Sequence, residues 1–186
     1  MKDPSLVEFR DRLMRALREH DLDFVISIME PDIKLSFGGE AGIEDFKKMW
    51  IKGDGPEVGQ FWTKMTEVLS MGGKLETDGK QKFFTAPYTF THFPQDLDAF
   101  ESIVITGANV NVREKPNLKS RVIESLTYEV VRTTGNQEQE DWAKVVMPSG
   151  RTGYVSQRFA RSPVDYRVRF STESGRWRMV FFLAGD

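Results

Sequence analysis

Within residues 103–162, the sequence reads Val110-Asn111-Val112-Arg113-Glu114-Lys115-Pro116 near the start and Gly150-Arg151-Thr152-Gly153-Tyr154-Val155 near the end. Two further runs lie between them, Val122–Leu126 and Asp141–Val146. Each run is short, rich in β-branched and aromatic residues, and closed by turn residues, which is typical of strands rather than helices. The segment therefore predicts a small all-β barrel.

Composition and charge narrow the class of protein. The chain has 186 residues, which allows one large domain or two small ones. Its hydrophobic content of 39% and charged content of 29% are ordinary for a globular protein. The formal net charge of −2 gives no general attraction for nucleic acid or for an anionic membrane surface, since both favour strongly basic proteins. We therefore expect no nucleic-acid partner.

The absence of cysteine excludes disulfides, thiolate nucleophiles and cysteine-based zinc sites. No apolar run approaches the ~20 residues that a membrane span needs, so no integral membrane segment is expected. A chain without cysteine suits an oxidising envelope compartment, whereas the start Met1-Lys2-Asp3-Pro4 lacks the core of a signal peptide. The expected location is therefore the periplasm or cell envelope if a leader was removed, and otherwise the cytoplasm.

The barrel segment resembles the bacterial SH3-type domain (SH3b). The resemblance rests on Asn111-Val112-Arg113, Pro116, Val122-Ile123, Trp142 with Lys144-Val145, and Gly150-x-x-Gly153-Tyr154-Val155. Such domains bind and do not usually catalyse, so the resemblance implies a non-enzymatic protein that recognises a peptide or a cell-wall (peptidoglycan) ligand. SH3-type grooves hold extended peptides between aromatic walls. The implied ligand-binding residues are Tyr128, Trp142, Tyr154, Asn111 and Arg113.

Several of these residues have a physical role that the resemblance suggests. Arg113 stands where the first strand ends, and its guanidinium can donate to carbonyls of the next turn. Gly150 and Gly153 permit the backbone angles of a tight hairpin. Trp142 and Tyr154 supply bulk to a barrel too small for a large aliphatic core. The acidic stretch 133–140 departs from the family pattern, because it is long for a loop that often borders the ligand groove.

Helical periodicity dominates the first seventy residues. Leu6, Phe9, Leu13 and Leu17 form one apolar stripe, which Asp3 or Ser5 can cap. We expect a shorter helix after Asp21, a strand over 33–37, and helices over 43–50 and 56–71. Asp78-Gly79 predicts a hairpin turn between 74–77 and 80–84. This part of the chain is therefore expected to combine helices with strands.

The C-terminal residues predict a second hairpin, with strands over 166–170 and 177–183, and the latter is apolar on both faces. Such a strand is usually central in a sheet. Asp21-Leu22-Asp23, Glu30-Pro31-Asp32-Ile33, Gly38-Gly39 with Gly42–Phe46, and Gly175–Met179 more faintly resemble the cone-shaped fold of nuclear transport factor two and ketosteroid isomerase. That resemblance implies early helices packed in a curved antiparallel sheet whose last strands are central.

The two resemblances together predict an α+β protein. Residues 1–101 form a helical α+β domain that the hairpin 163–186 completes, and residues 102–162 form an inserted SH3-like barrel. The insertion follows because an SH3-type barrel is complete by about Phe159 and has no use for a further apolar hairpin. The sequence leaves the oligomeric state and the identity of the ligand open.

Motifs for catalysis, metals and cofactors are weak. His20 and His92 are the only histidines and stand apart, so neither a catalytic dyad nor a metal site is expected. Gly53-Asp54-Gly55 follows no strand and precedes no phosphate-loop lysine, which argues against a nucleotide site. We therefore expect no catalytic residue, no metal site and no cofactor.

Other functions remain open at this stage. A small-molecule-binding or isomerase-like cone, with the barrel as an accessory, predicts a closed apolar pocket holding an acid or histidine of perturbed pKa. An assembly module whose barrel binds nothing in a groove is a third hypothesis. Arg167, Arg169, Arg176 and Arg178 could also form an anion-binding strip, although strand arginines are more commonly solvated and paired to nearby acids.

Overall fold

The computed structural model describes residues 3–133, 141–173 and 175–185. The chain divides into two compact units, one comprising Met1–Thr91 with Tyr166–Asp186 and the other His92–Asp165. We call them the mixed unit and the SH3-type unit. The sequence-based boundaries stood at 102 and 162, so the observed SH3-type unit extends ten residues further at its start and three further at its end. In the part of the chain that is described, no helix is both long and apolar enough to span a membrane.

The mixed unit combines helices with a five-stranded sheet. Its helices are α1 (Pro4–Glu19), α2 (Leu22–Ser27), α3 (Gly42–Lys47), the π-helix η1 (Lys48–Lys52), α4 (Phe61–Ser70) and α5 (Tyr88–Thr91). Its strands are β1 (Met29–Lys34), β2 (Lys74–Asp78), β3 (Gln81–Ala86), β11 (Arg167–Glu173) and β12 (Arg176–Leu183). The predicted α+β class is confirmed.

Two aspartates cap the first helices, as the sequence suggested. The Asp3 carboxylate accepts a hydrogen bond from the Leu6 amide at 3.1 Å and begins α1. The Asp21 carboxylate accepts from the Phe24 amide at 2.9 Å and begins α2. Such a cap is worth about 1 kcal/mol, because it satisfies an amide that has no partner within the helix. Ser5, the alternative cap of α1, lies inside the first turn instead.

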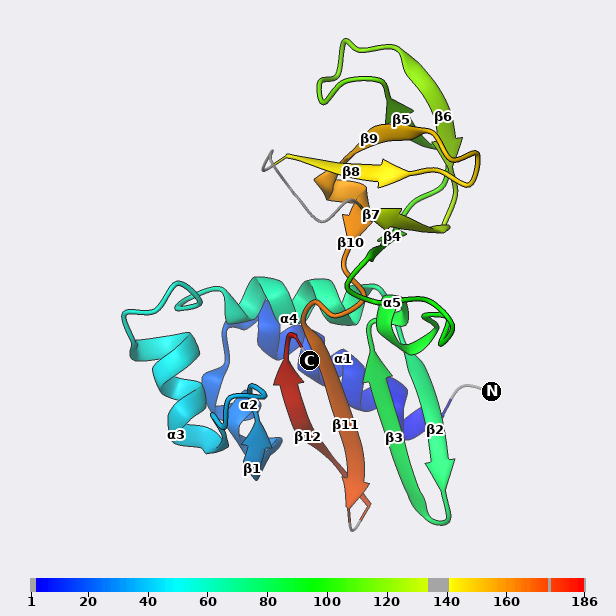
Figure 1. Cartoon of the computed structure of the whole chain (residues 1–186). Helices are drawn as coiled ribbons and strands as arrows, with labels where there is room; N and C mark the ends of the chain where they lie inside the picture. The colour runs from blue at the N-terminus through cyan, green and yellow to red at the C-terminus, as the bar shows by residue number, and fades with distance from the viewer. Residues whose placement is uncertain (1–2, 134–140, 174, 186) are drawn as a thin grey trace. The chain divides into compact units, whose positions relative to one another are not determined.

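The C-terminal hairpin lies in the middle of the sheet, as predicted. The strand order is β1-β12-β11-β3-β2, and Figure 1 shows β12 and β11 flanked by β1 and β3. All neighbours are antiparallel except β1 and β12, which run parallel. The parallel edge departs from the expected antiparallel sheet. It is possible because β1 and β12 are far apart in sequence, so no short turn imposes their direction.

Burial places the core of the mixed unit between its helices and one face of the sheet. Leu13 of α1 and Met65 of α4 are fully buried, as are Phe170 of β11 and Phe182 of β12. Aromatic rings supply much of the packing, with Trp50 of η1 5.3 Å from Phe182 between ring centroids. This interior is filled with side chains contributed by both ends of the chain.

Two predicted elements differ in extent. The helix α4 begins at Phe61 rather than Pro56, because residues 56–60 form turns. The strand β1 occupies 29–34 rather than 33–37, with Pro31 inside it. Proline is tolerated there because β1 is the edge strand of the sheet, where a missing amide need not interrupt a ladder; apart from β12, β1 is bridged only at Lys34, to Ala41, within the described residues.

The SH3-type unit is a single seven-stranded antiparallel sheet around one core. Its elements are β4 (Ser102–Ile105), β5 (Val110–Arg113), β6 (Val122–Leu126), β7 (Val130–Thr133), β8 (Trp142–Val146), β9 (Thr152–Ser156), the 3-10 helix η2 (Gln157–Phe159) and β10 (Ala160–Arg161). The order is β10-β4-β7-β8-β9-β5-β6. The end strands β10 and β6 do not pair in the described residues, so the predicted barrel is an open one.

Candidate functional site

Strand alternation in the SH3-type unit separates a core face from a solvent face. Val112 of β5, Ala143 and Val145 of β8, and Gly153 and Val155 of β9 are buried. Because successive residues of a strand point to opposite faces, their neighbours point away from the core. Those neighbours include four of the five residues that the sequence singled out as ligand-binding.

The strand register brings these four residues together. Tyr154 of β9 pairs with Arg113 of β5 on one side and with Lys144 of β8 on the other. Directly paired side chains stand about 4.5–5.5 Å apart at their Cβ atoms. Trp142 lies two residues before Lys144 on β8, and Asn111 lies two residues before Arg113 on β5. We call Asn111, Arg113, Trp142, Lys144 and Tyr154 the outer face.

The chemistry of the outer face is aromatic and cationic. Trp142 and Tyr154 are half-buried. Each therefore exposes part of its aromatic side chain to solvent, while the remainder packs against the sheet. Lys144 and Arg113 flank Tyr154 in the same row and add positive charge. Lys144 was used as part of the family motif but not expected to contact a ligand, and only the register of β8 against β9 indicates that role.

The core of this unit is aliphatic, contrary to the expectation that Trp142 and Tyr154 fill it. Its buried residues are Ile103, Ile105, Val110, Val112, Leu126, Val131, Ala143, Val145, Met147, Val155 and Ala160. These side chains fill the core without aromatic residues, because seven strands contribute to it and the unit is larger than the small barrel that the sequence predicted. The two aromatic side chains are therefore available on the outside.

Arg113 holds the loop that follows its strand, as its position suggested. One guanidinium nitrogen donates to the Ser120 carbonyl at 2.7 Å. The same loop is closed by the Glu114 amide donating to the Arg121 carbonyl at 3.0 Å. Arg113 thus positions the segment beside the outer face as well as contributing charge to it.

Tyr128, the fifth residue that the sequence indicated as ligand-binding, does not belong to the outer face. It occupies the turn between β6 and β7, with a left-handed φ of 51° and 60% of its surface exposed. Its amide donates to the Gly107 carbonyl at 3.0 Å. In the described residues, no ring contact joins it to Trp142 or Tyr154. Tyr128 therefore lies in a turn, outside the strand pairs that bring Trp142 and Tyr154 onto one face.

A second exposed aromatic side chain, Phe159, was missed by sequence reasoning. It is 37% exposed and lies next to Gly107, whose neighbour Thr106 donates its amide to the Phe159 carbonyl at 3.0 Å. The Arg158 guanidinium stands 5.6 Å from the centre of its ring. No local motif indicated this residue, because a phenylalanine at the end of a short 3-10 helix is usually explained by packing alone.

Two hollows in the unit involve other residues. One of ≈ 260 Å³ is lined by residues of β7, β8 and the turn after it, among them Arg132 and Met147. Another of ≈ 480 Å³ lies beside Glu114, Arg121 and Arg151. Its charges are compensated internally, since Arg121 pairs with Glu114 and Arg151 pairs with Glu124. The residues 134–140, which belong to the expected acidic loop, lie outside the described residues.

In the described residues, no group of three or more histidines and acids is placed to hold a metal ion. His20 stacks on Trp62 with ring centroids 4.8 Å apart, as an exposed residue at the end of α1. The isomerase-like alternative would need an acid or histidine inside an apolar pocket, whereas His20 lies on the surface.

The pKa shifts in the described residues also run opposite to those of a buried general acid. A hydrogen bond from Lys82 lowers the pKa of Asp3 far below its usual value. The Ser36 hydroxyl lowers the pKa of Glu40, and a hydrogen bond from Lys74 lowers that of Glu76. A carboxyl poised in an apolar pocket would instead have a raised pKa, because burial disfavours its charge.

The strand order, the single core and the outer face together define a small SH3-like module. In comparison with known families, residues 108–160 match the bacterial SH3 domain. This part of the chain belongs to that family, and the match begins just before β5 and ends at the first residue of β10. A domain of this family indicates a binding role. No curated protein matches the chain.

Proposed function

We propose that this chain is a non-enzymatic binding protein of the bacterial cell envelope. Its SH3-type unit would hold a peptide ligand, the peptide of peptidoglycan or one like it, against the outer face. The family match supports a binding role for residues 108–160. The peptide ligand and the location in the cell envelope go beyond this match and are part of what we propose.

The pairing of Tyr154 with both Arg113 and Lys144 is the observation on which this proposal rests. It places one aromatic side chain between two cationic ones, with Trp142 on the adjacent strand of the same face. Aromatic surfaces bind extended chains with a small loss of side-chain freedom, since their rings are rigid. Guanidinium and ammonium groups bind carboxylates through charge-assisted hydrogen bonds. A peptide carrying free carboxylates therefore matches both properties.

Sedimentation with purified peptidoglycan tests the proposal. We expect wild-type protein to sediment with the polymer, and Trp142→Ala or Tyr154→Ala to weaken binding by about tenfold each, the loss typical of an aromatic residue at the centre of a binding surface. Lys144→Gln should weaken binding and reduce its dependence on salt, because it removes one cation from the face. Thermal unfolding of each variant verifies that it is folded.

Tyr128→Ala provides the matched control. It removes the same kind of side chain from the same unit, but at a position outside the outer face. Unchanged binding of Tyr128→Ala beside weakened Tyr154→Ala supports the outer face as the site. Wild-type protein that stays in the supernatant would refute the proposed ligand, and equal losses for both variants would refute the proposed site.

A further inference from the structure

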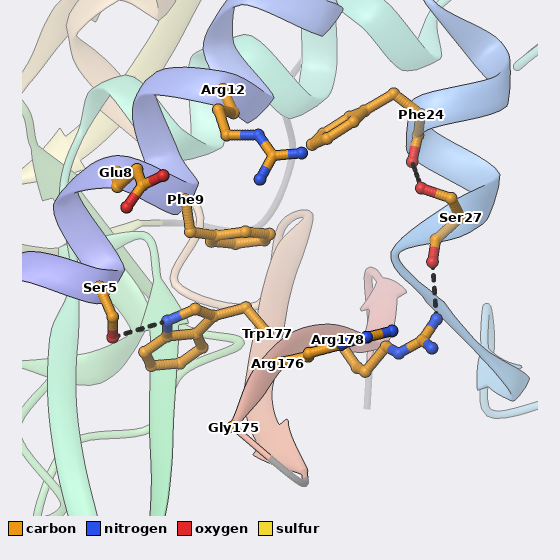
Figure 2. Close-up of a pocket in the computed structure, with 10 residues that line it drawn as sticks. All are labelled: Ser5, Glu8, Phe9, Arg12, Phe24, Ser27, Gly175, Arg176, Trp177 and Arg178. Atoms are coloured by element: carbon orange, nitrogen blue, oxygen red, sulfur yellow. Dashed lines mark hydrogen bonds between the residues drawn. The ribbon is translucent and has the colours of Figure 1, made fainter.

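A hollow of ≈ 520 Å³ opens in the mixed unit between α1, α2 and the first residues of β12 (Figure 2). The strand pairing explains why it is there. The ladder between β1 and β12 begins at Met29 opposite Met179. Residues 176–178 of β12 therefore extend past β1, and the end of α2 stands beside them instead of a strand. The Met179 amide donates to the Ile28 carbonyl at 2.6 Å, which joins β12 to the residue that follows α2.

The floor of the hollow is aromatic. Trp177 stacks on Phe9 of α1 with ring centroids 5.9 Å apart and an interplanar angle of 23°. Figure 2 shows the two rings one above the other, with the Trp177 indole nitrogen directed at Ser5. That nitrogen donates to the Ser5 hydroxyl at 3.2 Å. Phe24 of α2 forms the opposite wall. Phe9 is 9% exposed and Trp177 7% exposed, so the floor is rigid and offers a small apolar surface.

The rim carries three arginines, Arg12, Arg176 and Arg178, and one carboxylate, that of Glu8. Arg178 is fixed by donating to the Ser27 carbonyl at 2.6 Å, and Arg12 lies over the Phe24 ring at 5.4 Å. None of the three arginines forms an ion pair with a carboxylate whose side chain the structure describes. Among the lining residues whose side chains are described, three positive groups thus stand against one negative group.

We propose that this hollow binds a small organic anion, with a carboxylate or phosphate group held by the arginines and an apolar or aromatic body lying on Phe9 and Trp177. Guanidinium groups match the planar geometry of these anions and bind them through paired hydrogen bonds. The volume falls within the ~300–1,000 Å³ typical of small-molecule sites. Two of the four arginines of the predicted strip, Arg176 and Arg178, thus line the same hollow as Arg12 of α1.

The indole resonance of Trp177 reports binding directly. In a nitrogen–proton correlation spectrum of the full chain, the four tryptophans give four indole signals, and Trp177→Phe assigns the relevant one. We expect 3-phenylpropionate and phenyl phosphate each to shift the Trp177 signal saturably. The neutral 3-phenylpropanamide should bind at least tenfold more weakly, as should inorganic phosphate, which lacks the apolar body.

Matched arginine variants locate the anion. Arg12→Gln and Arg176→Gln should each weaken binding of 3-phenylpropionate about tenfold. Arg15→Gln removes the same charge from an exposed position of α1 that does not line the hollow, and should bind like wild type. The Trp142 signal of the SH3-type unit should stay unchanged, which separates this site from the proposed peptide site.

Three results would overturn the proposal. One is the absence of a saturable shift with either anion in folded wild-type protein. Another is equal affinity for the amide, since the arginines would then contribute nothing. The third is a loss of affinity with Arg15→Gln as large as that with Arg12→Gln. Both losses would then reflect the overall charge of the protein and not a contact between Arg12 and the anion.

Discussion

Gly153 lies within β9 where the backbone of β5 comes close. A Cβ atom added there would stand 2.5 Å from a methyl group of Val112 and 3.1 Å from the Arg113 carbonyl oxygen. Gly150, in the turn before β9, has a φ of 79° and open space around its Cα. The two glycines were expected to serve the same purpose. The structure shows that Gly150 supplies a left-handed turn, whereas Gly153 supplies room.

This difference predicts unequal effects of alanine. Gly153→Ala should destabilise the SH3-type unit by about 1–3 kcal/mol, because Val112 is fully buried and the Arg113 carbonyl belongs to the sheet, so neither can move freely. Gly150→Ala should cost about 1 kcal/mol, the price of a left-handed φ for a residue with a Cβ atom. Urea unfolding measures both. A Gly153→Ala protein as stable as wild type would contradict the close approach of β9 to β5.

Residue-level patterns indicated the outer face only in part. Trp142 and Tyr154 could be selected from the family motif, but their side of the sheet depends on the strand register, which the motif does not state. Lys144 belongs to the outer face because it pairs with Tyr154, and this pairing cannot be read from the motif. Phe159 gave no signal at all. Selection of Tyr128 rested on its residue type, and its exposed turn places it apart from the others.

At the scale of elements, Asp3 links α1 to β3. Its carboxylate caps the helix by accepting from the Leu6 amide and also pairs with Lys82 of β3. The hydrogen bond from Lys82 is the largest cause of its lowered pKa, followed by that from the Ser5 hydroxyl. A single side chain therefore contributes both to the start of a helix and to its attachment to the sheet.

Asp3→Asn separates these two contributions, because asparagine caps helices as well as aspartate but carries no charge. A lowered pKa in the folded protein stabilises it at pH values above the ordinary carboxyl pKa, and the stabilisation is lost as the pH falls toward the folded value. Asp3→Asn should therefore be less stable than wild type at pH 7, and the difference should shrink below about pH 4. Urea unfolding at pH 7 and pH 3 measures it. A constant difference would contradict the role of the ion pair.

Elements with local signals were predictable from sequence. The caps at Asp3 and Asp21 and the turn at Asp78-Gly79 depend on neighbouring residues, and all three are present. The strand β1 was misplaced because the alternation of Ile33, Leu35 and Phe37 with polar residues indicated a strand over 33–37, whereas the observed strand begins at Met29 and includes Pro31. The hollow beneath Arg12 was not predictable, since α1, α2 and β12 meet there from opposite ends of the chain.

At the scale of the whole molecule, the mixed unit depends on both ends of the chain. Residues 166–186 provide its two central strands, together with the buried side chains of Phe170, Met179 and Phe182. Ala86 of β3 pairs with Val168 of β11, so the last strand before the SH3-type unit and the first strand after it are neighbours in one sheet. The SH3-type unit lies between them in the sequence and has a core of its own.

This arrangement predicts which fragments fold. A chain in which a short Gly/Ser linker replaces residues 92–165 should keep a cooperative unfolding transition, because its strands and core remain complete. Residues 92–165 alone should also fold. Residues 1–91 alone should not, since the sheet loses both central strands and much of its buried aromatic surface. Circular dichroism with thermal unfolding measures all three fragments. Cooperative unfolding of residues 1–91 alone, or a disordered linker variant, would contradict the dependence of the mixed unit on its C-terminal hairpin.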